Sequence, residues 1–290
     1  MLIQGICNTT KYVSDKYVEL LNRGIEASQI LVLVQNPYKK NLIINEIKKR
    51  IKSFETTKNK IYTFSGLCYN AFKDNWDFIR SLSSSLTQED EPNLCGLEVS
   101  QYIFKQSIKE ADFSDYISKV NLLHQLFRRY SLIVQNDLSN EEVTKCSKIL
   151  NESFYKDAQK AIDDYKLKTI QYKSFDYLRQ MATLPLIYQK TDYFKDIKYL
   201  LIEDADEYSF AFWKFVDSIM PNIEDYLICY DKNGSTRCGY LCAYKNGVED
   251  FKKKYSPKET QLIENTEFYK IAESLYQNIK EKKKTKLTLC

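Results

Sequence analysis

The residues best suited to chemistry in this chain are four carboxylates that directly follow an apolar run. The run is 199–202, and Glu203, Asp204, Asp206 and Glu207 come after it. A segment that is apolar at every position is typical of a strand buried on both faces of a parallel sheet. Open α/β sheets bind ligands at the carboxyl ends of their strands, and carboxylates there can hold Mg²⁺. The plainer alternative is an acidic turn on the surface.

A second candidate is the loop after the first apolar stretch. A phosphate-binding loop requires G-x-x-x-x-G-K-[ST] between a strand and a helix, and Gly5 and Lys11 keep its outer spacing. Thr10 replaces the second glycine and Tyr12 the hydroxyl residue, so the backbone forms a phosphate nest less easily. The helix N-terminus still favours anions. The predicted nucleotide-binding residues are Gly5, Thr9, Thr10 and Lys11, and the alternative is that Lys11 is only a solvated side chain.

These candidates need a sheet to position them, and the hydrophobic pattern predicts one. Strand patterns occur at residues 2–5, 30–34, 61–64, 200–202, 226–229 and 261–263, with helical patterns between most of them. Alternating strands and helices imply right-handed crossovers. The predicted fold class is α/β, with a mostly parallel sheet, helices on both faces, and residues 200–202 at its centre.

The middle of the chain has a different pattern. A polar, loop-like segment at residues 81–92 leads into a region, 97–189, in which every clear pattern is helical. We therefore predict a sheet domain made of residues 1–82 and 190–290. An all-α insert of residues 83–189 interrupts it.

Composition sets limits on the class of protein. The chain has 290 residues, 43% of them hydrophobic and 28% charged, which is typical of a globular protein. No apolar run approaches the ~20 residues that span a bilayer, and no signal peptide is recognisable, so we expect a cytoplasmic protein with no membrane partner. The eight cysteines are scattered and the one histidine, His124, completes no zinc motif.

In the order of its segments, the chain resembles the N-terminal half of the UvrD/Rep group of superfamily 1 DNA helicases. Residues 5–11 lie where that family has its phosphate loop. Residues 29–36 resemble its ILVLTFTN segment, 61–68 its VGTFHSLC, 174–178 its DFDDLL helix and 200–207 its ILVDEFQD. The resemblance covers essentially the whole chain, and it implies a RecA-like P-loop NTPase domain, 1A, with the helical insert 1B.

The resemblance also implies ATP and Mg²⁺ as cofactors. Lys11 would hold phosphate, while Glu203 and Asp204 would be the catalytic residues. The same two carboxylates, together with Asp231, would be the ligands of Mg²⁺. A second RecA-like domain has no room in 290 residues, so unwinding by this chain alone is not expected.

Single-stranded DNA is the partner that the resemblance implies. Thr63 and Phe64 match the position at which the family grips the strand, and stacking on an aromatic ring contributes ~1–3 kcal/mol per base. The alternative for Phe64 is a core position at the end of a strand.

Arg237 would contribute a positive charge in the manner of an arginine finger. The alternative is an arginine in a solvated loop.

Several motif positions depart from the family. The Walker B pair is inverted as Glu203-Asp204, and the glutamine that senses the γ-phosphate is Asp206. In the next motif the glutamine is Gly234, and Glu267 replaces the arginine that contacts the γ-phosphate. These departures predict a degenerate ATPase domain that binds ATP and single-stranded DNA weakly, with little or no hydrolysis. The alternative is a non-enzymatic interaction protein, with a protein partner, that keeps only the fold.

Overall fold

The computed structural model describes most of the chain. The described residues are 1–5, 9–52, 54–55, 59–110, 119–147, 152–231, 234–235, 237, 242–261, 271, 274–275 and 277–279. The predicted strand at 261–263 therefore falls mostly outside them, as does Glu267. Among the described residues, none of the helices is long and apolar enough to cross a membrane.

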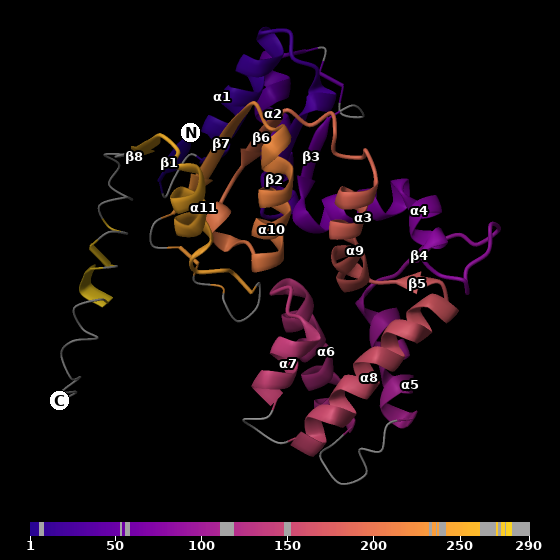
Figure 1. Cartoon of the computed structure of the whole chain (residues 1–290). Coiled ribbons are helices and arrows are strands. Elements are labelled where there is room, and N and C mark those ends of the chain that lie inside the picture. Colours follow the sequence, from indigo (N-terminus) through magenta and orange to yellow (C-terminus); the bar gives the residue numbers. More distant parts are fainter. Residues whose placement is uncertain are drawn as a thin grey trace, which may run out of the picture.

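Six parallel strands form one sheet in the order β3-β2-β6-β7-β1-β8 (Figure 1). The strands are β1 (Leu2–Gln4), β2 (Ile30–Val34), β3 (Lys60–Thr63), β6 (Tyr199–Ile202), β7 (Asp225–Tyr230) and β8 (Glu259–Gln261). Every residue of β2 and of β6 is buried, as expected for strands covered on both faces. The predicted α/β class, the parallel sheet and the central place of 200–202 are confirmed.

Helices cover both faces of the sheet and bury a separate core on each. On one face, α1 (Thr9–Asn22) and α2 (Pro37–Arg50) pack through side chains such as Val13, Tyr17 and Ile43. The other face is covered by α3 (Phe64–Asp74), α9 (Tyr177–Lys190), α10 (Phe210–Ile219) and α11 (Gly247–Tyr255). The short helix α4 (Trp76–Ser81) and the 3₁₀ segments η1 (Ala27–Gln29), η2 (Ala205–Glu207) and η3 (Met220–Asn222) complete this domain.

The middle of the chain forms a helical lobe beneath the sheet domain in Figure 1. Its helices are α5 (Leu97–Glu110), α6 (Lys119–Gln135), α7 (Asn140–Ser147) and α8 (Glu152–Gln171). α5, α6 and α8 share a third core, in which the rings of Phe104 and Tyr165 stack with their centroids 4.4 Å apart. The lobe thus has a hydrophobic centre of its own.

The prediction of an all-α insert was wrong in one detail. Where the chain enters and leaves the lobe, β4 (Asn93–Leu94) and β5 (Ser174–Phe175) pair as a short parallel ladder. The Asn93 amide donates to the Lys173 carbonyl, and the Cys95 amide donates to the Phe175 carbonyl. Two-residue strands leave no alternation in the sequence, so the pattern could not reveal them.

Two further differences concern boundaries. The strand predicted at 61–64 ends at Thr63, whose side chain caps α3 by accepting a hydrogen bond from the Gly66 amide at 3.0 Å. Phe64 is consequently the first residue of a helix. The sequence pattern grouped α9 with the insert, yet Met181, Leu184 and Ile187 of α9 lie in the core of the sheet domain.

We predict that Leu201→Ala lowers the free energy of unfolding by about 2–5 kcal/mol, because Leu201 is fully buried in the central strand β6. Urea unfolding monitored by circular dichroism measures the change. The matched control is Leu186→Ala, on an exposed position of α9, for which a change within ~0.5 kcal/mol is expected. Equal effects of the two substitutions would contradict the central position of β6.

Candidate functional site

The carboxyl ends of the central strands bring the predicted site residues to one edge of the sheet. The helices α1 and α2 begin there, and the acidic segment follows β6 directly. The Glu203 amide donates to the Leu33 carbonyl at 2.9 Å, which extends the β2–β6 ladder by one residue. Hydrogen bonding of the sheet therefore fixes the position of the Glu203 backbone, from which the side chain extends.

The Glu203 carboxylate lies at the N-terminus of α1 and is completely buried. Its Oε1 atom accepts hydrogen bonds from the hydroxyls of Thr9, at 3.1 Å, and of Thr10. The same oxygen accepts a hydrogen bond from Lys39 Nζ at 3.0 Å. Threonines predicted to hold a nucleotide thus bind a carboxylate of the protein itself, in the place where a helix N-terminus favours an anion.

Lys39 reaches this carboxylate from the first turn of α2. Asn36 caps that helix by accepting a hydrogen bond from the Lys39 amide at 3.0 Å, and Pro37 occupies the first helical position. Lys39 Nζ also lies 3.6 Å from Asp204 Oδ2. Burial lowers the pKa of Lys39, but the charges of Glu203 and Asp204 outweigh it and hold that pKa above its usual value.

The second carboxylate oxygen of Glu203 has a different environment from the first. Glu203 Oε2 is buried and makes no hydrogen bond within the described structure. An unpaired oxygen of a buried carboxylate costs free energy unless a cation or donor serves it. Asp204 follows with a left-handed backbone, φ +49°, a conformation that aspartate tolerates better than most residues.

Asp206, at the position that the resemblance gives to a γ-phosphate sensor, instead holds the loop after β7. Its carboxylate accepts hydrogen bonds from the amides of Asp231, at 2.8 Å, and Ser235, at 3.3 Å. A Cβ atom on Gly234 would lie 1.8 Å from Asp206 Oδ2, so only glycine permits this approach. Burial raises the pKa of Asp206 to about 6, although the two amide hydrogen bonds oppose that rise.

The remaining predicted residues have other partners or face solvent. Lys11 is exposed on α1, and the Gly5 amide donates to the Tyr230 carbonyl at 3.0 Å, which extends the pairing of β1 with β7. Arg237 forms an ion pair with Glu207, Nε to Oε2 at 3.0 Å, so it faces its own acidic segment.

The three predicted metal ligands do not form a metal site. Within the described part of the chain, no group of three or more His, Cys, Asp and Glu side chains is placed to hold a metal ion. Glu203 and Asp204 face Lys39, while the backbone of Asp231 is bound to Asp206. The residues present therefore do not fit Mg²⁺ as the resemblance implies.

The predicted DNA contact, Phe64, is a core residue with 6% of its surface exposed. Its ring packs edge-to-face on Phe212 and lies tilted against Phe215, with centroids 5.2 and 6.0 Å away. The structure thus favours the alternative that the sequence left open. Thr63, the other predicted contact, is the cap of α3.

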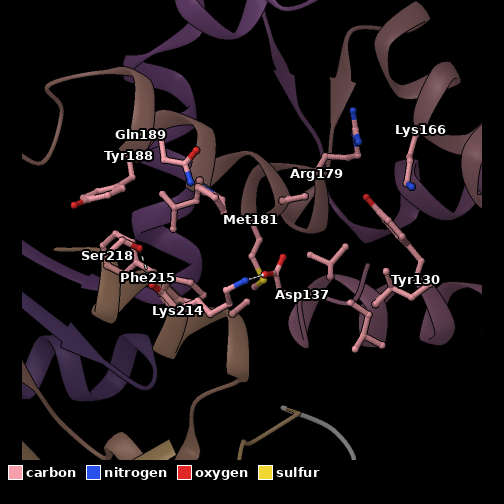
Figure 2. A pocket seen from close by; sticks show the side chains of 18 residues that line it. Tyr130, Asp137, Lys166, Arg179, Met181, Tyr188, Gln189, Lys214, Phe215 and Ser218 are labelled. Carbon is pink, nitrogen blue, oxygen red and sulfur yellow. Dashed lines mark hydrogen bonds and ion pairs between the residues drawn. The ribbon is translucent and has the colours of Figure 1, made fainter. Parts of the chain in front are cut away.

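Phe64 nevertheless forms part of the wall of a pocket of about 540 Å³ between α6, α9 and α10. Figure 2 shows Arg179 and Lys166 on the same side as Tyr130, while Lys214 is joined to Asp137. Three cationic side chains line the pocket against one carboxylate. Lys214 is paired with Asp137 and Lys166 with Asp163, so much of this positive charge is balanced by carboxylates of the chain. The size of the pocket suits a small or extended ligand with an apolar part.

Sequence reasoning missed Lys39 and the role of Asp206. For Lys39 a usable signal exists, because Asn36-Pro37 marks a helix start directly after strand β2. A lysine in that first turn lies at the carboxyl edge of the sheet. For Asp206 the sequence offers no comparable signal, since its partners are backbone amides of a distant loop.

The comparisons with known proteins add no relative. The chain matches none of the protein-family models that were searched, and the search of curated proteins gives no match either.

We predict that Asp206 makes stability fall as the pH rises from about 4 to about 6. Its pKa of about 6 in the fold exceeds the ordinary 3.8, so the folded state holds the proton more tightly. The resulting contribution, about 3 kcal/mol, is present at low pH and lost as Asp206 ionises. Urea unfolding at pH 4 and pH 7 should show the wild type losing about 2 kcal/mol relative to Asp206→Asn, because unfolded Asp206 is already partly ionised at pH 4. The control Asp77→Asn alters a side chain that is 88% exposed, and it should show no such pH-dependent difference.

Phe64→Ala should lower the free energy of unfolding by about 3–5 kcal/mol, because the ring is buried among the aromatic side chains of α10. Thermal and urea unfolding measure the loss. Tyr69→Ala, on an exposed position of the same helix, serves as the control. A small loss for Phe64→Ala would restore Phe64 as a candidate for base stacking.

Proposed function

We propose that this chain is a degenerate, helicase-like P-loop domain that binds ATP weakly and hydrolyses it at or near background rate. A parallel α/β sheet, with the exposed Lys11 near the start of α1 at its carboxyl edge, supports the nucleotide part of the proposal. The helicase-like part of the proposal is supported by the segments that resemble helicase motifs, which occur in the same order as in that family.

One observation supports the absence of turnover. The carboxylate that would assist hydrolysis, Glu203, is fully buried and already serves three donors. A general base must reach the proton that it removes. Oε1 already accepts from Lys39 and two threonines, and Oε2, which makes no hydrogen bond in the described structure, is buried away from solvent. Among the residues that the structure describes, no group of side chains is placed to hold the metal that would organise the phosphates.

Lys11 is the residue that we assign to phosphate. It projects into solvent from the first turns of α1, where its charge adds to that of the helix N-terminus. Thr10 directs its hydroxyl to Glu203 instead of outward. A single exposed lysine and a few amides predict affinity in the high-micromolar range or weaker, roughly −5 kcal/mol.

Single-stranded DNA is the nucleic acid that we propose for the pocket beside Phe64. Lys166, Arg179 and Lys214 line it, although Lys166 and Lys214 are also paired with Asp163 and Asp137. Tyr188 supplies an aromatic ring that is less buried than Phe64. Since charge dominates, binding should weaken steeply with salt. A base would then stack on the ring of Tyr188, while the buried Phe64 would only form part of the pocket wall.

The alternative function is that of a non-enzymatic interaction protein. One observation favours it, namely that the chain itself supplies partners for both acidic features of the edge: Lys39 for Glu203 Oε1, and the loop after β7 for Asp206. A fold that needs neither phosphate nor metal to neutralise these groups is stable without a ligand.

ATP turnover measured by phosphate release should not rise above background, with or without single-stranded DNA. Isothermal titration with ATP and with pyrophosphate should show weak binding that Lys11→Ala reduces for both ligands. Lys16→Ala, on the same helix but paired with Glu19 and Asp225, is the matched control. A DNA-stimulated rate near the ~10 s⁻¹ typical of enzymes, lost in Lys11→Ala, would contradict the proposal. Equal binding of pyrophosphate by wild type and Lys11→Ala would leave the interaction protein as the better explanation.

A further inference from the structure

The ammonium group of Lys39 stands where a metal ion would meet the two carboxylates of the acidic edge. Lys39 Nζ lies 3.0 Å from Glu203 Oε1 and 3.6 Å from Asp204 Oδ2. Mg²⁺ binds carboxylate oxygens at about 2.0–2.1 Å, needs near-octahedral geometry and usually keeps several waters. An ammonium group between the same two carboxylates leaves no room for that shell.

We propose that Lys39 is a tethered cation that takes the place of a divalent metal at Glu203 and Asp204. The site is therefore independent of metal: its buried carboxylate is neutralised by the chain itself. The inference about Lys39 deepens the proposed function, since a nucleotide held at α1 would bind equally well with and without Mg²⁺. It rests on the proposed function for the position of the phosphates.

The burial of Glu203 makes such a cation necessary. Its side chain is fully buried, and an isolated ionised carboxylate in that position would be very unfavourable. Thr9 and Thr10 supply hydrogen bonds but no charge. Lys39 is the ion-pair partner of Glu203 in the described structure, and its own side chain is only 27% exposed.

The position of Lys39 is built into α2. Asn36 accepts from the Lys39 amide, and Pro37 fixes the start of the helix, so the stem of Lys39 leaves the first turn toward β6. The next residue, Lys40, points elsewhere and places its ammonium over the ring of Tyr62 at 5.4 Å. Adjacent lysines on one helix thus have separate partners, which provides a matched control.

The free oxygen of Glu203 predicts what happens when Lys39 is removed. Oε2 is buried and makes no hydrogen bond in the described structure, and Oε1 would lose its charged donor. A small divalent cation would then gain both oxygens of Glu203, the Asp204 carboxylate and the threonine hydroxyls. Oxygen ligands of this kind are those that Mg²⁺ and Mn²⁺ prefer. Lys39→Met should therefore expose a latent metal site.

The first measurement uses the wild-type protein and Mn²⁺ alone, without nucleotide. Titration of Mn²⁺ followed by electron paramagnetic resonance should give the same weak binding for wild type and Glu203→Gln. Binding by the wild type that is about tenfold tighter than by Glu203→Gln would show that a metal shares the site with Lys39, and would overturn the proposal.

The second measurement uses melting temperature. Lys39→Met should melt about 10 °C lower than the wild type without metal, because one partner of a buried ion pair is lost. Millimolar Mn²⁺ or Mg²⁺ should restore much of that loss, whereas it should leave the wild type and Lys40→Met unchanged. The double variant Lys39→Met/Glu203→Gln removes both charges, so it should melt above Lys39→Met and ignore the metal.

Each result decides a different question. No response of Lys39→Met to metal would overturn the proposal, provided that its melting shows a folded protein. If Lys39→Met does not fold, Lys39→Met/Glu203→Gln must fold for the proposal to stand, because the buried charge would then be the cause. Since neither measurement contains nucleotide, failure of ATP to bind would count against the proposed function alone.

Discussion

A carboxylate taken out of water must obtain from the protein the hydrogen bonds and the electrostatic stabilisation that water supplied. Glu203 imposes this requirement on the structure, because the ladder between β2 and β6 carries its side chain into the interior. The N-terminus of α1 and the first turn of α2 meet the requirement together, through Thr9, Thr10 and Lys39. The start of each helix is thereby tied to the central strand, and the edge of the sheet becomes a polar cluster enclosed by two helices.

The same principle organises the neighbouring loop. Asp206 accepts backbone amides from the segment after β7, and the absence of a side chain at Gly234 lets that segment come close enough. In both places, groups of the protein satisfy carboxylates that the helicase resemblance assigns to metal or phosphate. The acidic edge is thus closed by its own chain, whereas Lys11 is exposed and a pocket lies between α6, α9 and α10.

The sequence predicted what depends on local pattern. A run of apolar residues before Glu203 placed β6 at the centre of the sheet, and periodic Leu and Ile residues located the helices. It could not show contacts that join distant segments: Lys39 and Glu203 lie 164 positions apart, and neither residue alone differs from an ordinary surface charge. Phe64 was ambiguous for a related reason, since a helix start and a strand end have the same apolar pattern over a few residues. The β4–β5 pair was too short to leave any pattern at all.

The order of the strands has a consequence for how the molecule is made. β1 precedes the other described strands of the sheet in the chain, yet both of its neighbours, β7 and β8, lie far along it. Synthesis of more than two hundred residues separates β1 from its partners, so the sheet is completed only after β7 and β8 have emerged. The helical lobe has no such delay, because its own core joins α5, α6 and α8. Pairing over such a distance is slow, and during it β1 has two unpaired edges of the kind that promote aggregation.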